Sequence, residues 1–294
     1  MDGILCIDKP EEMTSFLCVA IIRRLLGVKK VGHAGTLDPN ATGVLPLLIG
    51  RGTKLLDHLP CHDKCYTATL RFGAVSDTLD IWGKVTETGG TIPTLAEVEA
   101  ALPAFRGDIM QVPPMTSALK KDGVRLYDLA RQGIEVEREA RPVTIYELEL
   151  LDYNEKEGLL TLHCHCSSGT YIRTLCDDLG RMLGCGAVMT ALRRTMAAGY
   201  PLTDCITLDE AKALAEAGTL ADRLLPLESA LAAYPAVTVS APQAARFRNG
   251  GALDLTRLRQ KVEGPVRVYD PDGTCIALGA PDSGVLKMTC LLQV

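Results

Sequence analysis

The chain has 294 residues, a formal net charge of −5, 47% hydrophobic residues and 23% charged residues. This composition is typical of a globular protein with a sizeable core, and it excludes a disordered or collagen-like chain. No apolar run reaches the roughly 18 residues that a membrane span needs, and the acidic start Met1–Ile4 lacks the basic region of a signal peptide. We therefore predict one large and one small domain, with no membrane segment.

The eleven cysteines follow no framework spacing, which predicts reduced thiols and a cytoplasmic location. Two Cys/His runs, 58–65 and 163–166, allow a zinc alternative. In the run 163–166, strand alternation puts His163 and His165 on the face opposite the two cysteines, so the four cannot surround one tetrahedral ion. We predict no metal site, and 58–65 is the better-spaced alternative.

The first predicted elements are a strand, a helix and a second strand. Residues 3–8 are apolar, as in a buried strand. Thr14 or Ser15 can cap a helix whose apolar positions share one face and which ends at Gly27. Residues 44–49 form a continuous apolar run, which predicts another buried strand.

A glycine-rich loop lies between that helix and the second strand. Residues 32–43, here called the Asp38 loop, contain three glycines, one histidine, one proline and a single carboxylate. Glycine permits positive φ and close backbone approach, and Pro39 fixes φ directly after the acid. The loop lacks the Gly-Lys-Ser/Thr ending of a phosphate-binding P-loop. We predict a rigid loop that presents Asp38.

The middle of the chain predicts strands, two capped helices and an excursion. Capping boxes begin helices at Thr94 and Thr207. Residues 108–141 are polar and basic with Pro113-Pro114, which is typical of an excursion from a core. The predicted strands are 66–72, 141–153 and 159–166.

Residues 170–183 give the clearest helix, with one apolar stripe and Gly184 as its C-terminal cap. Arg173 lies in its first turn, where a cation opposes the helix dipole. This position predicts a compensating anion nearby.

The composition changes after Ala232. Ser240 caps a short helix, and residues 266–270, 274–280 and 285–292 predict strands, so 235–294 form a small, mostly-β domain after a first domain of residues 1–232. Strands and helices follow no strict β-α-β order. The fold class is therefore α+β with a mixed central sheet.

Six motifs, in order, resemble those of the TruB family of tRNA pseudouridine synthases, and the match extends to about Pro226. The first, Gly-His-x-Gly-x-Leu-Asp-Pro-x-Ala-x-Gly-x-Leu, is residues 32–45. One departure stands out, because Thr116 occupies a position where the family usually has tyrosine. The other five motifs are Lys64-Cys65-Tyr66, Asp77-Thr78-Leu79-Asp80, Pro113 to Lys120, Cys166 to Thr174, and Leu192-Arg193-Arg194.

The resemblance implies the pseudouridine synthase fold, a PUA-like C-terminal domain and an RNA-gripping insertion at about 108–141. It also implies isomerisation of uridine 55 in the T-arm of tRNA, with the base flipped out of the RNA. Isomerisation requires no redox cofactor. We expect a monomer that uses no guide RNA and whose specificity comes from the shape of the folded loop.

The resemblance makes Asp38 the catalytic carboxylate, with Arg173 as the partner that orients it and Tyr66 stacking on the extruded uracil. Whether Asp38 attacks the base, attacks C1′ or assists elimination to a glycal stays open at this point.

The expected substrate-binding residues surround these three. His33 fills the space vacated by the base, Leu192 and Tyr171 line the uracil pocket, and Lys64 contacts phosphate. Lys120, Arg193 and Arg194 are further expected phosphate contacts.

Two alternatives remain open. One is a non-catalytic protein that binds or folds tRNA on the same scaffold. The other is a nucleoside hydrolase, in which Asp77 or Asp80 supplies a second carboxylate beside Asp38. Release of free uracil would distinguish hydrolysis from isomerisation.

Overall fold

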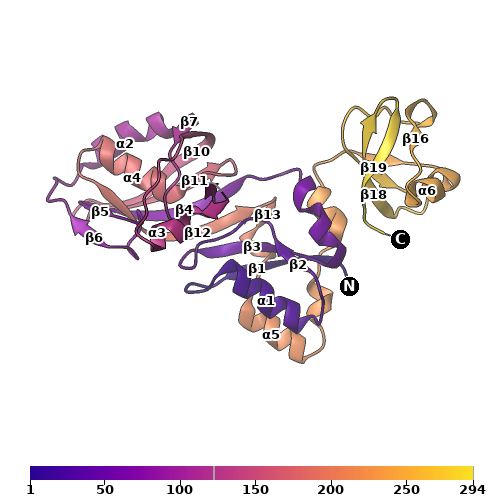
Figure 1. Ribbon diagram of the computed structural model, residues 1–294, viewed down its shortest axis with the longest axis horizontal. Coiled ribbons are helices and arrows are strands. Elements are labelled where there is room, and N and C mark those ends of the chain that lie inside the picture. Colours follow the sequence, from indigo (N-terminus) through magenta and orange to yellow (C-terminus); the bar gives the residue numbers. More distant parts are fainter. Residues whose placement is uncertain (122, 294) are drawn as a thin grey trace. The chain divides into compact units, whose positions relative to one another are not determined.

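The computed structural model describes residues 1–121 and 123–293, which form two compact units (Figure 1). The first unit contains residues 1–39, 44–62 and 198–294, and the second contains residues 40–43 and 63–197.

The first part of the first unit consists of short strands in a mixed arrangement and two helices. β1 (Gly3–Lys9) lies between β14 (Ile206–Thr207), which is parallel to it, and β3 (Thr42–Ile49). Its other elements are α1 (Ser15–Leu25), β2 (Val31–His33), β13 (Tyr200–Pro201) and α5 (Leu208–Glu216).

The predicted helix caps in this region are confirmed. The Thr14 hydroxyl accepts a hydrogen bond from the Leu17 N–H at the start of α1, and Gly27 follows its end with a φ of 62°. Thr207 and Glu210 form a capping box on α5. The helices pack their apolar faces on the strands in one core that includes Ile7, Ile22, Leu47 and Ala211.

The last part of the first unit is a separate β-rich module. Its five strands are ordered β15-β17-β18-β19-β16, and α6 packs against them over its own core around Phe247 and Val268. Figure 1 shows β18 and β19 side by side in this module. Its elements are β15 (Ala236–Thr238), α6 (Ala241–Arg248), β16 (Leu253–Asp254), β17 (Val266–Tyr269), β18 (Cys275–Asp282) and β19 (Val285–Leu291).

The second unit is built on a sheet with the order β12-β4-β11-β10-β7. These neighbours are antiparallel, whereas Thr42 and Gly43 at the start of β3 pair with β12 in parallel, so the sheet is mixed. The strands are β4 (Lys64–Phe72), β7 (Gly107–Gln111), β10 (Arg141–Asn154), β11 (Leu159–Cys166) and β12 (Ala187–Ala197).

The second unit also contains α4 (Ile172–Met182), α2 (Leu95–Ala101) and a short hairpin. α4 packs against β12, and α2 begins at the predicted Thr94 capping box. Gly184 has a φ of 74°, as expected for the residue that ends α4. The hairpin consists of β5 (Ala74–Ser76) and β6 (Val85–Glu87).

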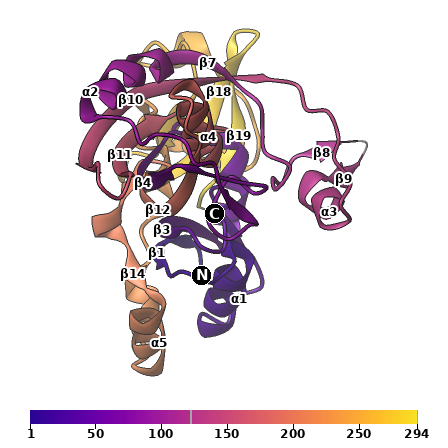
Figure 2. The ribbon, with the colours of Figure 1, turned by 90° about the vertical axis from the view of Figure 1, so that its left-hand side faces the viewer.

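An excursion leaves the sheet between β7 and β10. Figure 2 shows its elements set off from strands β10 and β11; they are β8 (Lys120–Lys121), β9 (Val124–Arg125) and α3 (Leu126–Arg131). The sheet itself continues to Gln111, because the main chain of Gln111 pairs with Arg141. The part of the predicted excursion that leaves the sheet therefore begins after Gln111.

The fold class predicted from the sequence, α+β with a mixed sheet and a mostly-β C-terminal module, is confirmed by this architecture. None of the helices within the described residues is long and apolar enough to cross a membrane. Short 3-10 helices join the elements at Gly50–His58, Leu102–Phe105, Leu202–Asp204, Leu220–Arg223, Leu227–Leu231 and Leu255–Arg257.

Candidate active site and RNA-binding surfaces

The Asp38 loop is held in place by side chains from the start of the first unit. The Ser15 hydroxyl donates to the carbonyl of Leu37 at 3.0 Å and accepts from its N–H at 2.9 Å. These two hydrogen bonds fix the backbone directly before Asp38. The Asp38 side chain is half-buried. The loop therefore presents a carboxylate from a restrained backbone.

Lys9, at the end of β1, supplies a second anchor that the sequence did not predict. Its side chain is fully buried, and its ammonium donates to the carbonyls of Pro10, Met13 and Pro39 at 2.7–2.8 Å. Burial of a charged group requires such compensation. Pro39 directly follows Asp38, so the loop is restrained on both sides of the acid.

The last glycine of the loop has a packing role. A Cβ on Gly43, which has a φ of 102°, would lie 2.1 Å from the carbonyl oxygen of Arg194. Only glycine allows the two backbones to approach this closely. This contact joins the Gly-rich motif to the Leu192-Arg193-Arg194 motif.

The two arginines of that motif behave differently. Arg193 is half-buried and donates to the Thr42 hydroxyl at 3.2 Å. Arg194 is fully buried, so the expectation that it contacts an RNA phosphate is wrong. Adjacent strand residues point to opposite faces, and Arg194 lies on the sheet face that also carries Leu192 and Tyr66, whereas Arg193 lies on the other.

Two expected uracil contacts lie on one face of the second unit's sheet. Tyr66 pairs with Arg194 and Leu192 pairs with Ala68, so Tyr66 and Leu192 are diagonal neighbours on β4 and β12. Their exposed fractions are 7% and 9%. Lys64, two residues before Tyr66, is half-buried at the start of β4.

Arg173 lies in the first turn of α4, with its side chain only 6% exposed. Its Nη1 donates to the Thr78 carbonyl at 3.1 Å, to Asp80 Oδ2 at 3.4 Å and to the Thr116 hydroxyl at 2.6 Å. Its Nη2 donates to the Thr116 carbonyl at 3.0 Å. Asp80 is thus one compensating anion of the kind predicted for this position.

The loop that carries Asp80 is held in a strained conformation. Asp80 Oδ1 accepts from the Thr78 hydroxyl at 2.6 Å and from the Trp82 N–H at 3.1 Å. Leu79, between Thr78 and Asp80, has a φ of 66°, which is rare for a bulky side chain and is found where the surroundings enforce it. The acceptors that surround Arg173 are therefore prearranged.

Tyr171 is the residue before α4, and Gln111 holds its peptide group. The Gln111 amide donates to the Tyr171 carbonyl at 3.0 Å and accepts from the Tyr171 N–H at 2.7 Å. Gln111 is buried and ends β7. Sequence reasoning missed it, although it directly precedes the Val112-Pro113-Pro114 segment.

The expected site residues divide between the two units. Asp38 and His33, which is half-buried at the end of β2, belong to the first unit. Lys64, Tyr66, Tyr171, Arg173 and Leu192 belong to the second unit. The pairing of Asp38 with Arg173 remains a prediction.

The two Cys/His runs do not form a metal site among the residues that the structure describes, where no group of three or more His, Cys, Asp or Glu side chains could hold an ion. In the run 163–166, a hydrogen bond with Cys166 and burial raise the pKa of Cys164.

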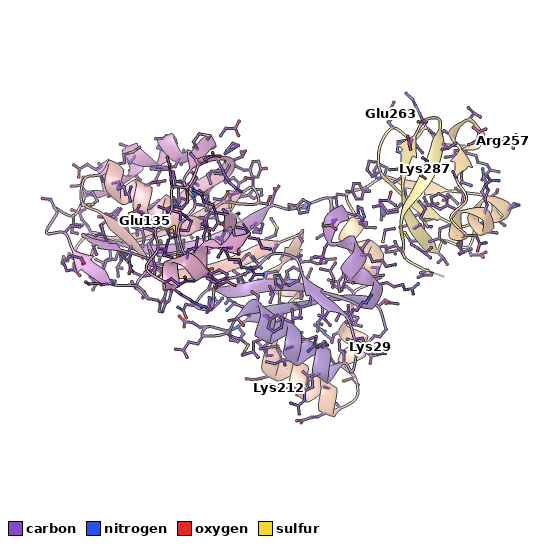
Figure 3. The ribbon with its side chains drawn as sticks, in the orientation of Figure 1. Lys29, Glu135, Lys212, Arg257, Glu263 and Lys287 are labelled. Carbon is purple, nitrogen blue, oxygen red and sulfur yellow. The ribbon has the colours of Figure 1, made fainter. Side chains whose placement is uncertain are left out.

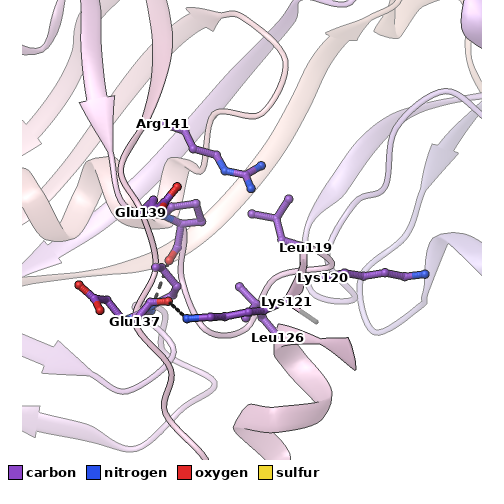
Figure 4. Close-up of a pocket in the computed structure, with 9 residues that line it drawn as sticks. Leu119, Lys120, Lys121, Leu126, Glu137, Glu139 and Arg141 are labelled. Atoms are coloured by element: carbon purple, nitrogen blue, oxygen red, sulfur yellow. Dashed lines mark hydrogen bonds between the residues drawn. The ribbon is translucent and has the colours of Figure 1, made fainter. Parts of the chain in front are cut away.

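A cavity of about 230 Å³ lies within the insertion (Figure 4). One of its walls is the segment that returns to β10, where the carbonyl of Glu137 accepts a hydrogen bond from Lys121 Nζ at 2.8 Å. Its lining carries both cations and anions. The lining residues are Pro113, Leu119, Lys120, Lys121, Leu126, Glu137, Arg138, Glu139 and Arg141.

The cations of the C-terminal module are partly neutralised. Arg257 lies 3.7 Å from Asp254, and Lys261 is paired with Glu263. Arg257 and Lys287 extend from the surface of the module (Figure 3). Arg248 pairs with the buried Asp270.

Three family models match consecutive parts of the chain. Residues 23–172 match the N-terminal domain of the TruB family of pseudouridylate synthases. Residues 173–232 match the C-terminal domain of tRNA pseudouridylate synthase B, and residues 235–292 match the C-terminal model of pseudouridine synthase II TruB.

Curated relatives and solved structures agree with these matches. The tRNA pseudouridine synthase B of Dechloromonas aromatica is 46% identical over 97% of this chain and 93% of its own length. That of Geobacillus thermodenitrificans is 44% identical over 95% and 94%. A chain in the crystal structure of a Cbf5-Nop10-Gar1 complex shares the fold, with a TM-score of 0.76, 24% identity and coverage of 99% of this chain and 85% of that chain. From its motifs, its fold and these matches, the chain belongs to the TruB family of pseudouridine synthases.

Proposed function

We propose that this enzyme isomerises uridine 55 in the T-arm of tRNA to pseudouridine, with Asp38 as the catalytic carboxylate. The observation that carries the proposal is the Asp38 loop, which presents one half-buried carboxylate from a backbone anchored by Ser15 and Lys9. The relatives named tRNA pseudouridine synthase B support tRNA as the substrate.

The reaction breaks the N1–C1′ bond of uridine and forms a C5–C1′ bond. The hydrogen on C5 leaves as a proton, and N1 gains a proton. No electrons are gained or lost, so the chain's own acids and bases suffice. The Asp38 carboxylate acts on the uridine while the detached base turns, and exclusion of water prevents hydrolysis. A restrained carboxylate loses little entropy in reaching its reacting geometry.

Arg173 and Tyr66 complete the proposed catalytic set. Arg173 is buried in a shell of acceptors that fixes its guanidinium, so it can hold a second anion in a defined direction, and we assign Asp38 to that role. Tyr66, on a central strand of its sheet, offers a ring on which the flipped uracil stacks.

The remaining assignments concern RNA. His33 occupies the space of the flipped base, Leu192 and Tyr171 line the uracil pocket, and Lys64 contacts phosphate. The insertion between Gln111 and Arg141 grips the folded T-arm, and the C-terminal module of residues 235–294 adds a second RNA surface. In this proposal the enzyme acts as a monomer in the cytoplasm, without a guide RNA.

The hydrolase alternative is not supported by the geometry around Asp80. Both of its carboxylate oxygens already accept hydrogen bonds, from Thr78, Trp82 and Arg173. A second catalytic carboxylate would have to face the glycosidic bond. Assay of free uracil tests this directly, and we expect none.

Substitution of Asp38 tests the proposed function. A tRNA transcript labelled with [5-³H]uridine should release tritium with the wild-type enzyme, and Asp38→Asn should abolish release because the amide has the shape of the carboxylate but no charge. Binding of the transcript, measured by filter retention, should stay within about twofold of wild type, because one neutralised acid near RNA changes affinity little.

The matched control is Asp57→Asn, since Asp57 is an exposed aspartate of the same unit. It should release tritium at the wild-type rate. A transcript with cytidine at position 55 should release none. Tight binding without tritium release from any tRNA would exclude the enzyme assignment and favour the non-catalytic alternative.

A further inference from the structure

The Arg173 guanidinium is held at both of its terminal nitrogens by one residue of the insertion. Thr116 Oγ1 accepts from Nη1 at 2.6 Å, and the Thr116 carbonyl accepts from Nη2 at 3.0 Å. Thr78 and Asp80 both accept from Nη1, at 3.1 Å and 3.4 Å. Thr116 thus contacts both ends of the guanidinium, and its hydroxyl makes the shortest of the three contacts to Nη1.

The hydroxyl contact depends on the residue type at this position. The family motif that this chain resembles has tyrosine here, and a phenol carries its hydroxyl far from its own backbone. Thr116 Oγ1 is attached directly to Cβ, so it lies beside the same guanidinium that the Thr116 carbonyl contacts. Serine could reproduce this short geometry.

The segment that carries Thr116 is fixed independently of its hydroxyl. The Gln111 amide clamps the Tyr171 peptide, and the Thr174 hydroxyl donates to the Val112 carbonyl at 3.4 Å. Pro113 and Pro114 follow and restrict the backbone. Loss of the Thr116 hydroxyl should therefore leave the segment in place.

We propose that Thr116 is a positioning residue, through which the base of the insertion sets the orientation of Arg173 for the isomerisation. The inference rests on the proposed function, because it assigns Arg173 the task of orienting Asp38. Thr116 acts through Arg173 and touches neither the uridine nor the reacting atoms.

The test compares three variants in single-turnover pseudouridine formation with saturating enzyme. Thr116→Val has nearly the same shape without the hydroxyl and should lower the rate constant about tenfold, as expected for loss of one hydrogen bond to a charged group. Thr116→Ser should recover the rate to within about twofold. The tRNA dissociation constant should stay unchanged in both variants.

The matched control is Thr144→Val. The Thr144 hydroxyl bonds Asp108 Oδ1 at 2.7 Å, at the β7–β10 pairing from which the insertion leaves the sheet, and makes no contact with Arg173. This variant should match the wild type in rate and affinity. Urea unfolding should show that all three variants remain fully folded under the assay conditions.

A second readout does not depend on activity. Nitrogen-15 NMR of the free protein reports rotation of the Arg173 guanidinium, which should be faster in Thr116→Val and restored in Thr116→Ser. A wild-type rate and wild-type rotation in Thr116→Val would overturn the inference, as would a loss of tRNA affinity with an unchanged rate constant. An inactive wild type with faster rotation in Thr116→Val would contradict the proposed function and leave the positioning of Arg173 supported.

Discussion

Asp270 closes the turn between β17 and β18 with hydrogen bonds to its carboxylate. The N–H groups of Asp272 and Thr274 donate to Oδ1, and the Arg248 guanidinium donates to Oδ2. The main-chain bond from Thr274, together with the Arg248 charge and hydrogen bond, holds the pKa of Asp270 below its usual value. The turn is therefore stabilised by the ionised form.

This lowered pKa predicts loss of the turn in acid. Because the folded pKa lies below the unfolded value of about 3.9, the stabilisation is complete above that value and disappears as the pH falls through the folded pKa. Hydrogen-exchange protection of the Asp272 and Thr274 amides should fall as the pH drops below about 4. Asp270→Asn should lower protection at neutral pH and remove this pH dependence.

The control for this prediction is Asp272→Asn, because the Asp272 side chain is exposed. It should keep the wild-type profile. A wild-type pH dependence in Asp270→Asn would assign the effect to other carboxylates.

The contacts of a single residue were predictable where its local sequence position requires a partner of a particular kind. Arg173 at a helix start required an anion, and the structure provides Asp80. The sequence could not identify Thr116 as a partner of Arg173, or Lys9 as an anchor of Pro39. In both cases the two residues lie on segments that are brought together only by folding. Buried Arg194 shows the same limit, since charge alone predicted exposure.

At the scale of elements, α4 depends on a close approach to the turn that follows it. A Cβ on Gly180 would lie 2.2 Å from the Ala187 nitrogen and 2.4 Å from the Gly186 carbonyl carbon. These are backbone atoms, which cannot rotate away as a side chain can. The glycine thus allows the helix that carries Arg173 to lie against the start of β12.

Gly180→Ala should therefore destabilise the protein by about 1–3 kcal/mol, although helix propensity alone favours alanine by about 1 kcal/mol. Urea unfolding followed by circular dichroism measures the change. The matched control, Gly184→Ala, has open space around the added Cβ but a φ of 74°, so strain alone should cost about 1 kcal/mol. Equal stabilities of wild type and Gly180→Ala would show that the turn moves aside.

Elements were predictable where caps and periodicity agree. Thr94 and Thr207 begin helices as expected, and the long hairpin is β10 and β11. The strand β7 was not predicted, because Gly107–Gln111 has no strong alternation and is defined by its pairing with β10. Pairing with a distant strand is invisible to local periodicity.

At the scale of the whole molecule, the net charge of −5 requires a local cationic surface for RNA. Ion pairs with Asp254 and Glu263 weaken the cations of the C-terminal module. In the insertion, Lys120 is exposed beside the cavity. The net charge of the chain is therefore a poorer guide to RNA binding than the positions of a few cationic side chains.

Lys120→Ala should weaken tRNA binding several-fold and reduce the slope of log affinity against log salt by about 1, as expected for one lost phosphate contact. Filter binding over a range of salt concentrations measures both quantities. Lys156→Ala, at the exposed turn between β10 and β11, is the control and should change neither. Equal effects of the two substitutions would indicate a long-range charge effect instead of a contact.

The hydrogen bonds of the buried Lys9 ammonium constrain the residue type at the donor position more than at the acceptor positions. Its acceptors on Pro10, Met13 and Pro39 are all main-chain carbonyls, which every amino acid possesses. For this anchorage, the three accepting positions can change identity without losing an acceptor, whereas replacement of the donor by an apolar residue would lose all three bonds. The anchorage of the backbone beside Asp38 should therefore tolerate substitution at the three acceptor positions and be sensitive to substitution of Lys9.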